Sequence, residues 1–351
     1  MTAATEEVLP ELTFASSPHT RTRLDTGTVM RLVCVSLAPA ALASVYIFGL
    51  RSLFVIVASV VTCVVTELLC NLVFRKDITV ADGSAAVTGI LFAFTLPPTT
   101  PLFMVVIGGF LAIFVVKQLF GGLGYNIFNP ALAARAILLS SWPVALTTWV
   151  KPVKSFLAVD AVTSASPLGI IKEAARAGGA AVDVVTSASA LGVVKEAAGA
   201  GGAADWTRNY LGLFLGTIPG SLGETCKVAL LLGAVLLLVL KIIDWRLPFT
   251  YIGTVAILSI PLGRDPLAAV LSGGLILGAF FMATDPVTSP TTRAGKLVFG
   301  LGCGVLTALI RSFGGFPEGV CYSILFMNCL ALLIDKYVRP RVFGARTVWS
   351  W

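Results

Sequence analysis

The sequence predicts an all-α integral membrane protein of about ten transmembrane helices, arranged as two inverted five-helix repeats with interrupted helices. Its 351 residues are 57% hydrophobic and only 12% charged, and the mean hydropathy is +0.93. A soluble domain carries about 25% charged residues. Apolar runs of about 20 residues, the length needed to cross a bilayer, recur along the whole chain. A faint repetition also relates the first half of the sequence to the second half.

The apolar runs define the candidate spans. Ten segments qualify, at residues 30–49, 52–74, 84–97, 102–120, 129–148, 226–243, 247–262, 266–284, 296–312 and 318–338. The third is short, and Gly, Pro or Asn interrupts the third, fifth, seventh and eighth. An interrupted helix is tolerated at membrane depth only where its loosened backbone is buried in protein or lines a cavity. We therefore expect a functional site to be built around these interruptions.

The basic residues predict that both termini are cytoplasmic. With the N-terminus inside, fourteen Lys and Arg residues, Lys117 among them, flank the cytoplasmic ends of the spans. The opposite short loops contain only three, Arg51, Arg264 and Arg311. This bias follows the positive-inside rule. It also accounts for the net charge of +7, so nucleic-acid binding is not indicated. The first 29 residues lack the pattern of a cleavable signal, and we expect a multi-pass protein of the inner (cytoplasmic) membrane.

The chain is expected to divide into five parts. These are a cytoplasmic segment 1–29, a first transmembrane half 30–148, a long extracytoplasmic loop 149–225, a second transmembrane half 226–338 and a cytoplasmic tail 339–351. The halves share Asp-x-x-Ala-Ala-Val at residues 82 and 265, and Phe-Gly-Gly at residues 120 and 313. Since five helices is an odd number, the second half enters the membrane from the opposite side, as in an inverted-repeat transporter fold.

Two polar motifs border the interrupted helices. In the stretch 121–131, three glycines free the backbone while Asn126 and Asn129 offer amide groups, which indicates either a polar pocket for a flat cofactor or ion, or a close helix contact. In the stretch 220–225, Ser221 and Glu224 have the spacing of a helix capping box. Such a helix start also attracts anions and acceptor-rich rings.

Acidic residues in or beside the spans predict an ion pathway. Glu67 lies inside the second span, whereas Asp285 and Glu318 border others. Intramembrane acids are costly and usually serve ion or proton passage. The seven cysteines form no Cys-x-x-Cys pair and the chain has one histidine, so we expect no metal or iron–sulfur site built by this chain alone.

The long loop contains a tandem repeat. Residues 159–181 and 182–204 are identical at 18 of 23 positions, and each copy opens with Asp-x-x-Thr-Ser-Ala-Ser. The motif positions are Asp160, Thr163 and Ser166 in the first copy, and Asp183, Thr186 and Ser189 in the second. No base or metal ligand accompanies the hydroxyls, so a nucleophilic role has little support. The residues alone leave two interpretations, a solvated linker and a loop that another protein modifies.

At these residues the chain resembles a known membrane family, the D subunit of the Rnf electron-transport complex. It is more distantly similar to the B subunit of sodium-translocating NADH:quinone reductase. The similarity extends over nearly the whole length, and the short N-terminus favours the Rnf family. The matching segments are 17–19, 82–98, 121–131, the repeated loop motif, 220–225, 282–289, 311–319 and 339–344.

The resemblance implies that FMN is bound covalently. In the family, the last hydroxyl of the loop motif, normally a threonine, carries FMN in a phosphoester bond that a separate flavin transferase makes outside the cytoplasm. Here that position is Ser166 or Ser189, and Ser166 is favoured because the first copy keeps the Pro-Leu that follows in many relatives. Thr163 and Thr186 are then recognition positions, and Asp160 and Asp183 can order the turn.

The resemblance also implies a function shared with other subunits. We expect a membrane subunit that relays electrons between ferredoxin and NAD through flavin, coupled to Na⁺ or H⁺ translocation. Soluble flavin and iron–sulfur subunits and further membrane subunits would complete the complex. A second, non-covalent flavin such as riboflavin is an open question near Asn126 and Glu224. The alternative is a secondary transporter or channel with the same inverted-repeat fold and no redox role, which would need no flavin acceptor loop.

Overall fold

The computed structural model describes residues 25–76, 79–150, 163–164, 210–216, 219–314 and 319–338, and most of these residues are helical. The first half comprises α1 (Thr26–Phe48), α2 (Leu50–Val73), the 3₁₀ turn η1 (Val80–Asp82), α3 (Ser84–Phe94), α4 (Leu102–Leu111), the π-helix η2 (Ala112–Gln118), α5 (Pro130–Ser141) and α6 (Pro143–Thr147). The second half comprises α11 (Lys227–Val239), α12 (Arg246–Ser259), α13 (Pro266–Leu271), α14 (Leu275–Leu277), the π-helix η3 (Gly278–Met282), α15 (Arg293–Phe313) and α16 (Val320–Tyr337).

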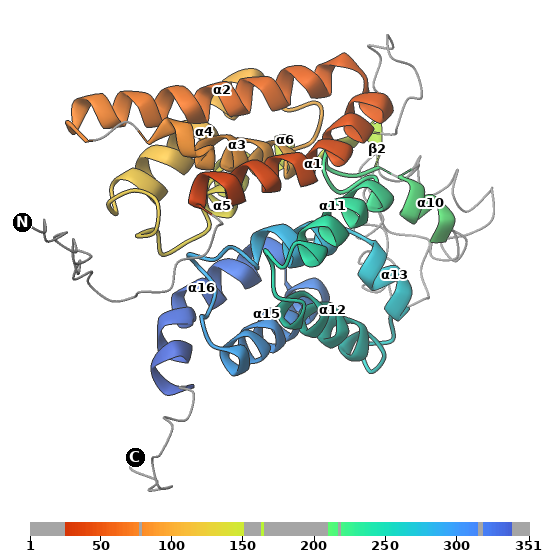
Figure 1. Cartoon of the computed structure of the whole chain (residues 1–351). Coiled ribbons are helices and arrows are strands. Elements are labelled where there is room, and N and C mark those ends of the chain that lie inside the picture. Colours follow the sequence, from red (N-terminus) through yellow and green to blue (C-terminus); the bar gives the residue numbers. More distant parts are fainter. Residues whose placement is uncertain are drawn as a thin grey trace, which may run out of the picture.

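Between the halves in sequence lie three short elements. Strands β1 (Trp149–Val150) and β2 (Thr163–Ser164) pair antiparallel, and α10 (Tyr210–Leu215) packs against α11 and α13. Figure 1 shows the orange and yellow helices of the first half lying above the green and blue helices of the second half. The all-α membrane architecture is thus as expected, with one two-residue strand pair added.

Each predicted span contains helix, but the helices differ in length. Within the described residues, four helices are long and apolar enough to cross a membrane unaided, namely α1, α2, α15 and α16. The third, fourth, fifth and sixth predicted spans appear as shorter apolar helices. The eighth is broken, because α13 ends at Leu271 and α14 resumes at Leu275 after a turn in which Gly273 adopts a positive φ of 67°.

The expected interruption of the seventh span is wrong. α12 runs without a break from Arg246 to Ser259. Pro248 lies in its first turn, where the missing N–H has no helical acceptor in any case. Gly253 is accommodated inside the helix. The fourth span carries an unexpected irregularity, because α4 continues into the π-helix Ala112–Gln118.

Neighbouring chain segments satisfy the backbone at the end of the short helix α3. The N–H groups of Leu222 and Gly223 donate to the carbonyls of Leu96 and Phe94, each at 3.0 Å. A Cβ on Gly223 would meet Phe94 at 2.3 Å, so only glycine allows this approach. The stretch 220–225 therefore serves as a docked loop that completes a helix of the other half.

The two halves meet along α1 and α11 and along α5 and α16, which pack in pairs. The closest approach is at Gly233 of α11, where an added Cβ would lie 1.9 Å from the carbonyl oxygen of Ser36 in α1. Small residues permit this kind of close helix packing in membranes. The contact between the halves therefore depends on the absence of a side chain at position 233.

We predict that Gly233→Ala destabilises the protein by about 1–3 kcal/mol, because overpacking forces α1 and α11 apart. The matched control is Gly253→Ala in α12, where an added Cβ meets nothing within 4 Å. Alanine there should stabilise the helix by about 0.5–1 kcal/mol. Thermal unfolding of the purified chain in detergent measures both variants. A Gly233→Ala protein that unfolds at the wild-type temperature would contradict the packing.

Candidate functional site

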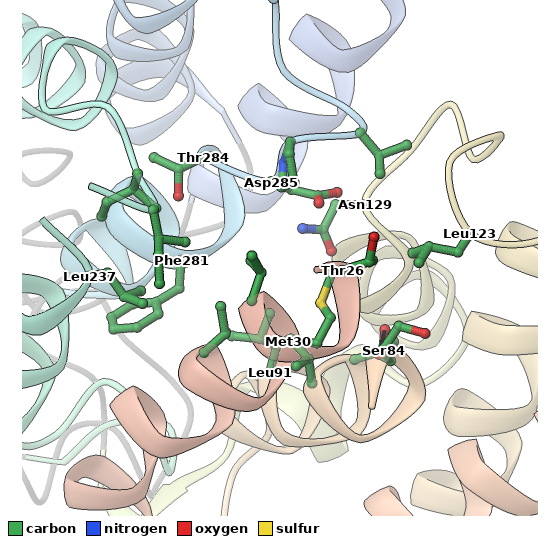
Figure 2. Close-up of a pocket in the computed structure, with 18 of the residues that line it drawn as sticks. Thr26, Met30, Ser84, Leu91, Leu123, Asn129, Leu237, Phe281, Thr284 and Asp285 are labelled. Carbon is green, nitrogen blue, oxygen red and sulfur yellow. Dashed lines mark hydrogen bonds between the residues drawn. The ribbon is translucent and has the colours of Figure 1, made fainter. Parts of the chain in front are cut away.

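A pocket of about 410 Å³ lies between the two halves. Most of its wall is apolar, from side chains of α1, α3, α11 and η3. Figure 2 shows Met30 and Leu91 of the first half facing Phe281 and Leu237 of the second across this space. The polar lining residues are Thr26, Ser84, Thr88, Lys117, Asn126, Asn129, Lys241, Thr284 and Asp285. The size and the few polar groups are typical of a small-molecule site.

Asn129 connects the pocket to both halves. Its Oδ1 accepts from the N–H groups of Ala131 and Leu132 and so caps α5, while its Nδ2 donates to the carbonyl of Met282 at 3.2 Å. The amide thus satisfies backbone at the start of one helix and at the end of the π-helix η3 in the other half. Asn126 also lines the pocket, and its Nδ2 donates to the carbonyl of Phe128 at 3.1 Å. Both asparagines predicted from the sequence therefore lie at the pocket.

Asp285 lies at the same pocket, in the loop that follows η3. It is half-buried, and its Oδ2 accepts from the hydroxyl of Thr288 at 3.1 Å. Figure 2 shows its carboxylate beside Asn129 at one end of the pocket. The structure thus brings together Asn126, Asn129 and Asp285, which the sequence placed in two different halves.

One wall of the pocket is the turn between α11 and α12. Asp244 fixes this turn, since it accepts from the N–H of Arg246 at 3.2 Å and faces the Nζ of Lys296 at 3.4 Å. Burial alone would raise the pKa of Asp244. The hydrogen bond from the Arg246 backbone and the charges of Lys296 and Arg246 outweigh that effect and lower the pKa. The carboxylate is therefore ionised at neutral pH and holds the turn in place.

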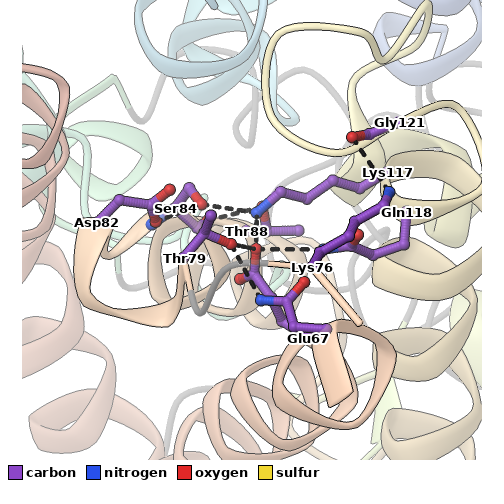
Figure 3. Close-up of polar contacts among 10 residues, drawn as sticks. Glu67, Lys76, Thr79, Asp82, Ser84, Thr88, Lys117, Gln118 and Gly121 are labelled. Carbon is purple, nitrogen blue, oxygen red and sulfur yellow. Dashed lines mark hydrogen bonds and ion pairs between the residues drawn. The ribbon is translucent and has the colours of Figure 1, made fainter. Parts of the chain in front are cut away.

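Glu67, the acid predicted inside the second span, is paired with a buried lysine. Its Oε1 lies 2.6 Å from the Nζ of Lys117, and both side chains are almost fully buried, at 1% and 2% exposure. The same Nζ donates to the hydroxyl of Ser84 at 2.6 Å. Gln118 and Thr79 donate weakly to the same Oε1, each at 3.4 Å. Figure 3 shows this cluster between α2, α3 and η2.

Lys117, counted among the basic residues at span ends, is almost fully buried. Lys117 is the sixth residue of the π-helix Ala112–Gln118, and this helix turns its ammonium inward to Glu67. Breaking such a buried pair by removing one partner costs about 3–5 kcal/mol. The signal in the sequence was a lysine that directly follows five apolar residues (112–116), but its partner lies 50 positions away.

Glu224 lies outside the pocket and does not form the predicted capping box. α11 begins at Lys227 with Cys226 as its N-cap, so Ser221 and Glu224 precede the helix. The Glu224 carboxylate instead lies 3.6 Å from the guanidinium of Arg135 in α5. It also packs against Gly274, where an added Cβ would meet Oε1 at 2.6 Å. Glu224 therefore supports the break between α13 and α14.

Two buried basic residues complete that break. Arg311 donates to the carbonyls of Ala269 and Ser272, at 2.7 Å and 3.2 Å, and Lys227 donates to the carbonyl of Gly273 at 3.3 Å. These carbonyls have no helical partner because the helix stops there. The sequence placed Arg311 in a short loop outside the membrane and gave no sign of this structural role.

The repeated loop is described only at Thr163 and Ser164, whose backbone forms β2. This strand pairs with β1, and Thr163 lies opposite Val150. The first copy of the repeat is thus hydrogen-bonded through β2 to β1, the strand that follows α6. The other predicted loop positions, Asp160, Ser166, Asp183, Thr186 and Ser189, lie outside the described residues, as does Glu318. Within the described residues no three His, Cys, Asp or Glu side chains gather as they would around a metal ion.

The comparisons with known proteins agree over almost the whole chain. A family model described as the NQR2, RnfD, RnfE family matches residues 13–344. The chain is 46% identical over 341 residues to the D subunit of the proton-translocating ferredoxin:NAD(+) oxidoreductase complex of Clostridium ljungdahlii, and the match covers 95% of this chain and 96% of that protein.

Two further relatives carry related names. The chain is 40% identical over 340 residues to the D subunit of the Na(+)-translocating ferredoxin:NAD(+) oxidoreductase complex of Acetobacterium woodii, with 96% of each chain covered. It is 38% identical over 356 residues to the D subunit of the ion-translocating oxidoreductase complex of Halorhodospira halophila, with 94% of each covered. The chain therefore belongs to the NQR2, RnfD, RnfE family.

Proposed function

We propose that this chain is the D subunit, a membrane component, of an ion-translocating ferredoxin:NAD⁺ oxidoreductase and relays electrons through flavin. The observation that carries the proposal is the match to a relative named as that subunit, which is 46% identical and aligns over 95% of this chain. The chain has one histidine and no Cys-x-x-Cys, so partner subunits supply the iron–sulfur and nicotinamide chemistry. The relatives are named for H⁺ in one case and Na⁺ in another, so the coupling ion of this chain is open.

The membrane topology follows the same proposal. We assign ten spans in two inverted repeats, with both termini cytoplasmic and residues 149–225 outside. The pairing of α1 with α11 and of α5 with α16 supports it, because a pseudo-two-fold axis brings equivalent helices together. Asp82 and Asp265 also play the same part, each accepting from the N–H two residues later at the start of α3 and α13.

The repeated loop is the proposed site of covalent FMN, at Ser166 with Ser189 as the alternative. A phosphoester needs a hydroxyl, and serine differs from the threonine of the family only by a methyl group that restricts χ1. A loop outside the membrane is accessible to a flavin transferase. The covalent bond then prevents loss of the cofactor from the loop.

We predict that Ser166→Ala loses the covalent FMN, and that the matched control Ser164→Ala, two residues earlier in the motif, retains it. Mass mapping of loop peptides from the wild type, both variants and Ser189→Ala measures the attachment. An impermeant maleimide that labels Ser155→Cys in intact cells checks that the loop is outside. Complete loss of FMN in Ser189→Ala, with Ser166→Ala fully loaded, would reverse the choice. FMN that persists in the Ser166→Ala/Ser189→Ala double variant would show that neither copy of the motif is the attachment site.

The pocket is the proposed place of a second, non-covalent flavin. Its volume of about 410 Å³ and its apolar walls suit a flat ring, and the amides of Asn126 and Asn129 supply hydrogen-bond partners for ring edges. Glu224 does not line the pocket, so we assign it no contact with this flavin. Of the two amides, Asn126 has the smaller structural role and is the better target.

We predict that Asn126→Ala weakens binding of the non-covalent flavin about tenfold, or by about 1.4 kcal/mol, so that less flavin is released on acid denaturation. The covalent FMN in the same sample is the internal control and should not change. Fluorescence of the supernatant and of the precipitate measures the two pools separately. Equal release from the wild type and the variant would exclude Asn126 as a ligand.

Glu67 and Asp285 are the proposed acids of the ion pathway. Glu67 is buried at membrane depth, and Asp285 lines the pocket that Lys117 and Ser84 also reach. The same buried acid and broken helices suit a secondary transporter without flavin, which remains the second candidate function. Covalent flavin on the chain distinguishes the two.

We predict that Glu67→Gln, which removes the buried acid, lowers cation uptake per electron by about tenfold, while flavin content is unchanged. Asp25→Asn is the control, because Asp25 is exposed and its side chain caps nothing. The double variant Glu67→Gln/Lys117→Gln, which removes both buried charges, controls for folding. Cation uptake and electron transfer are measured together in proteoliposomes. If cation uptake per electron is unchanged in Glu67→Gln, the Glu67–Lys117 pair has only a structural role.

A further inference from the structure

We propose that Lys117 is a tethered counter-cation, which neutralises Glu67 between transport events and is displaced when the transported cation binds that carboxylate. The inference rests on the proposed function, in which Glu67 belongs to the ion pathway. It assigns a role to a residue that lies outside the predicted polar motifs. Lys117 would set how tightly the cation is held and how readily it leaves.

The charge balance at Glu67 favours exchange over simple binding. Glu67 and Lys117 are both almost fully buried, and their pair is neutral. A carboxylate without a counter-charge is costly there, and so is an excess cation. If Na⁺ or H⁺ binds Glu67 while the ammonium leaves, one monovalent cation replaces another. The carboxylate is then neutralised in every state.

The atoms around the ammonium are suited to such a replacement. Lys117 Nζ contacts two side-chain oxygens, Glu67 Oε1 and Ser84 Oγ, both at 2.6 Å. Carboxylate and hydroxyl oxygens are the ligands that hard cations prefer. The second carboxylate oxygen, Oε2, is buried and has no hydrogen-bond partner among the described residues. One acceptor of the acid therefore stays available while Lys117 occupies the other.

The pocket between the halves offers space for the displaced ammonium of Lys117. Lys117 and Ser84 both line the pocket between the halves, and Asp285 lines the same pocket. A lysine has a flexible four-carbon stem. It also lies near the end of a π-helix, a geometry that is frequent at functional sites. A swing into the pocket would therefore move the ammonium into a space that already contains a carboxylate.

The other titratable groups around the pair are accounted for. Cys63 and Cys70 lie on α2 with Glu67, and Asp82 accepts from the hydroxyl of Ser84 at 2.7 Å. Lys76 is exposed, and its Nζ donates to the carbonyl of Gly121 at 3.4 Å. Among the described residues, Lys117 pairs with Glu67, whereas Figure 3 shows Lys76 bonded to Gly121, so Lys76 provides a matched control.

The test uses the whole complex in proteoliposomes and compares the wild type, Lys117→Gln, Lys117→Arg and Lys76→Gln. Electron-driven cation uptake is titrated with Na⁺ at fixed pH and, separately, with protons at fixed Na⁺. A pair that is closed in about nine molecules of ten weakens apparent cation affinity about tenfold. Lys117→Gln should therefore lower the half-saturating concentration of the transported cation about tenfold, with a slower maximal rate because release is impaired.

Lys117→Arg should change the half-saturating concentration in the opposite direction, because a permanently charged guanidinium competes more persistently for Glu67. Lys76→Gln should behave as the wild type. Unchanged half-saturation in Lys117→Gln and Lys117→Arg would overturn this inference alone, provided that Glu67→Gln lowers cation uptake per electron. A Glu67→Gln complex that takes up as much cation per electron as the wild type would overturn the proposed ion role of Glu67 and this inference with it. If the complex with Lys117→Gln does not assemble, the half-saturating cation concentration of Lys117→Arg tests the inference by itself.

Discussion

The structure depends on the need to satisfy backbone polar groups where helices stop inside an apolar environment. A membrane offers no water to these groups, so the protein must supply their partners. The N–H groups of Leu222 and Gly223 donate to the carbonyls at the end of α3. Arg311 and Lys227 donate to the carbonyls at the break after α13. The side-chain amide of Asn129 donates to the carbonyl of Met282 at the end of η3. In each case the partner comes from a distant part of the sequence. Of these contacts, the one between Asn129 and Met282 joins the two halves at the pocket.

These contacts explain why the helices were predictable and their partners were not. Apolar length and composition predicted the all-helical architecture, because the hydropathy of a segment is a local property. Each predicted span contains helix, and four helices of the described part of the chain are long and apolar enough to cross a membrane. The asparagines at 126 and 129 and the acid at 285 were also found, since unusual polar groups near interruptions stand out locally. The structure adds that one pocket unites them. The interruption expected in α12 failed, because Pro248 lies in a first turn that tolerates it.

The sequence did not reveal the burial of two basic residues. Lys117 and Arg311 lie in the last turns of η2 and α15, and the sequence treated them as charges that flank the spans. Their burial depends on partners 50 and about 40 positions away, which no local pattern reveals. Ser221 and Glu224 had the spacing of a capping box, but the chain turns before α11 and directs Glu224 to Arg135 instead. Local spacing was outweighed by tertiary contacts in each case.

The central claim is that this chain is a redox subunit whose polypeptide carries flavin, and not a transporter with a similar fold. The most direct measurement is the fluorescence under ultraviolet light of the chain on a denaturing gel, after expression with its flavin transferase and complete extraction of free flavin. A redox subunit of this kind gives a fluorescent band at the position of the 36.7 kDa polypeptide. A band that stains for protein and shows no flavin fluorescence would contradict the claim.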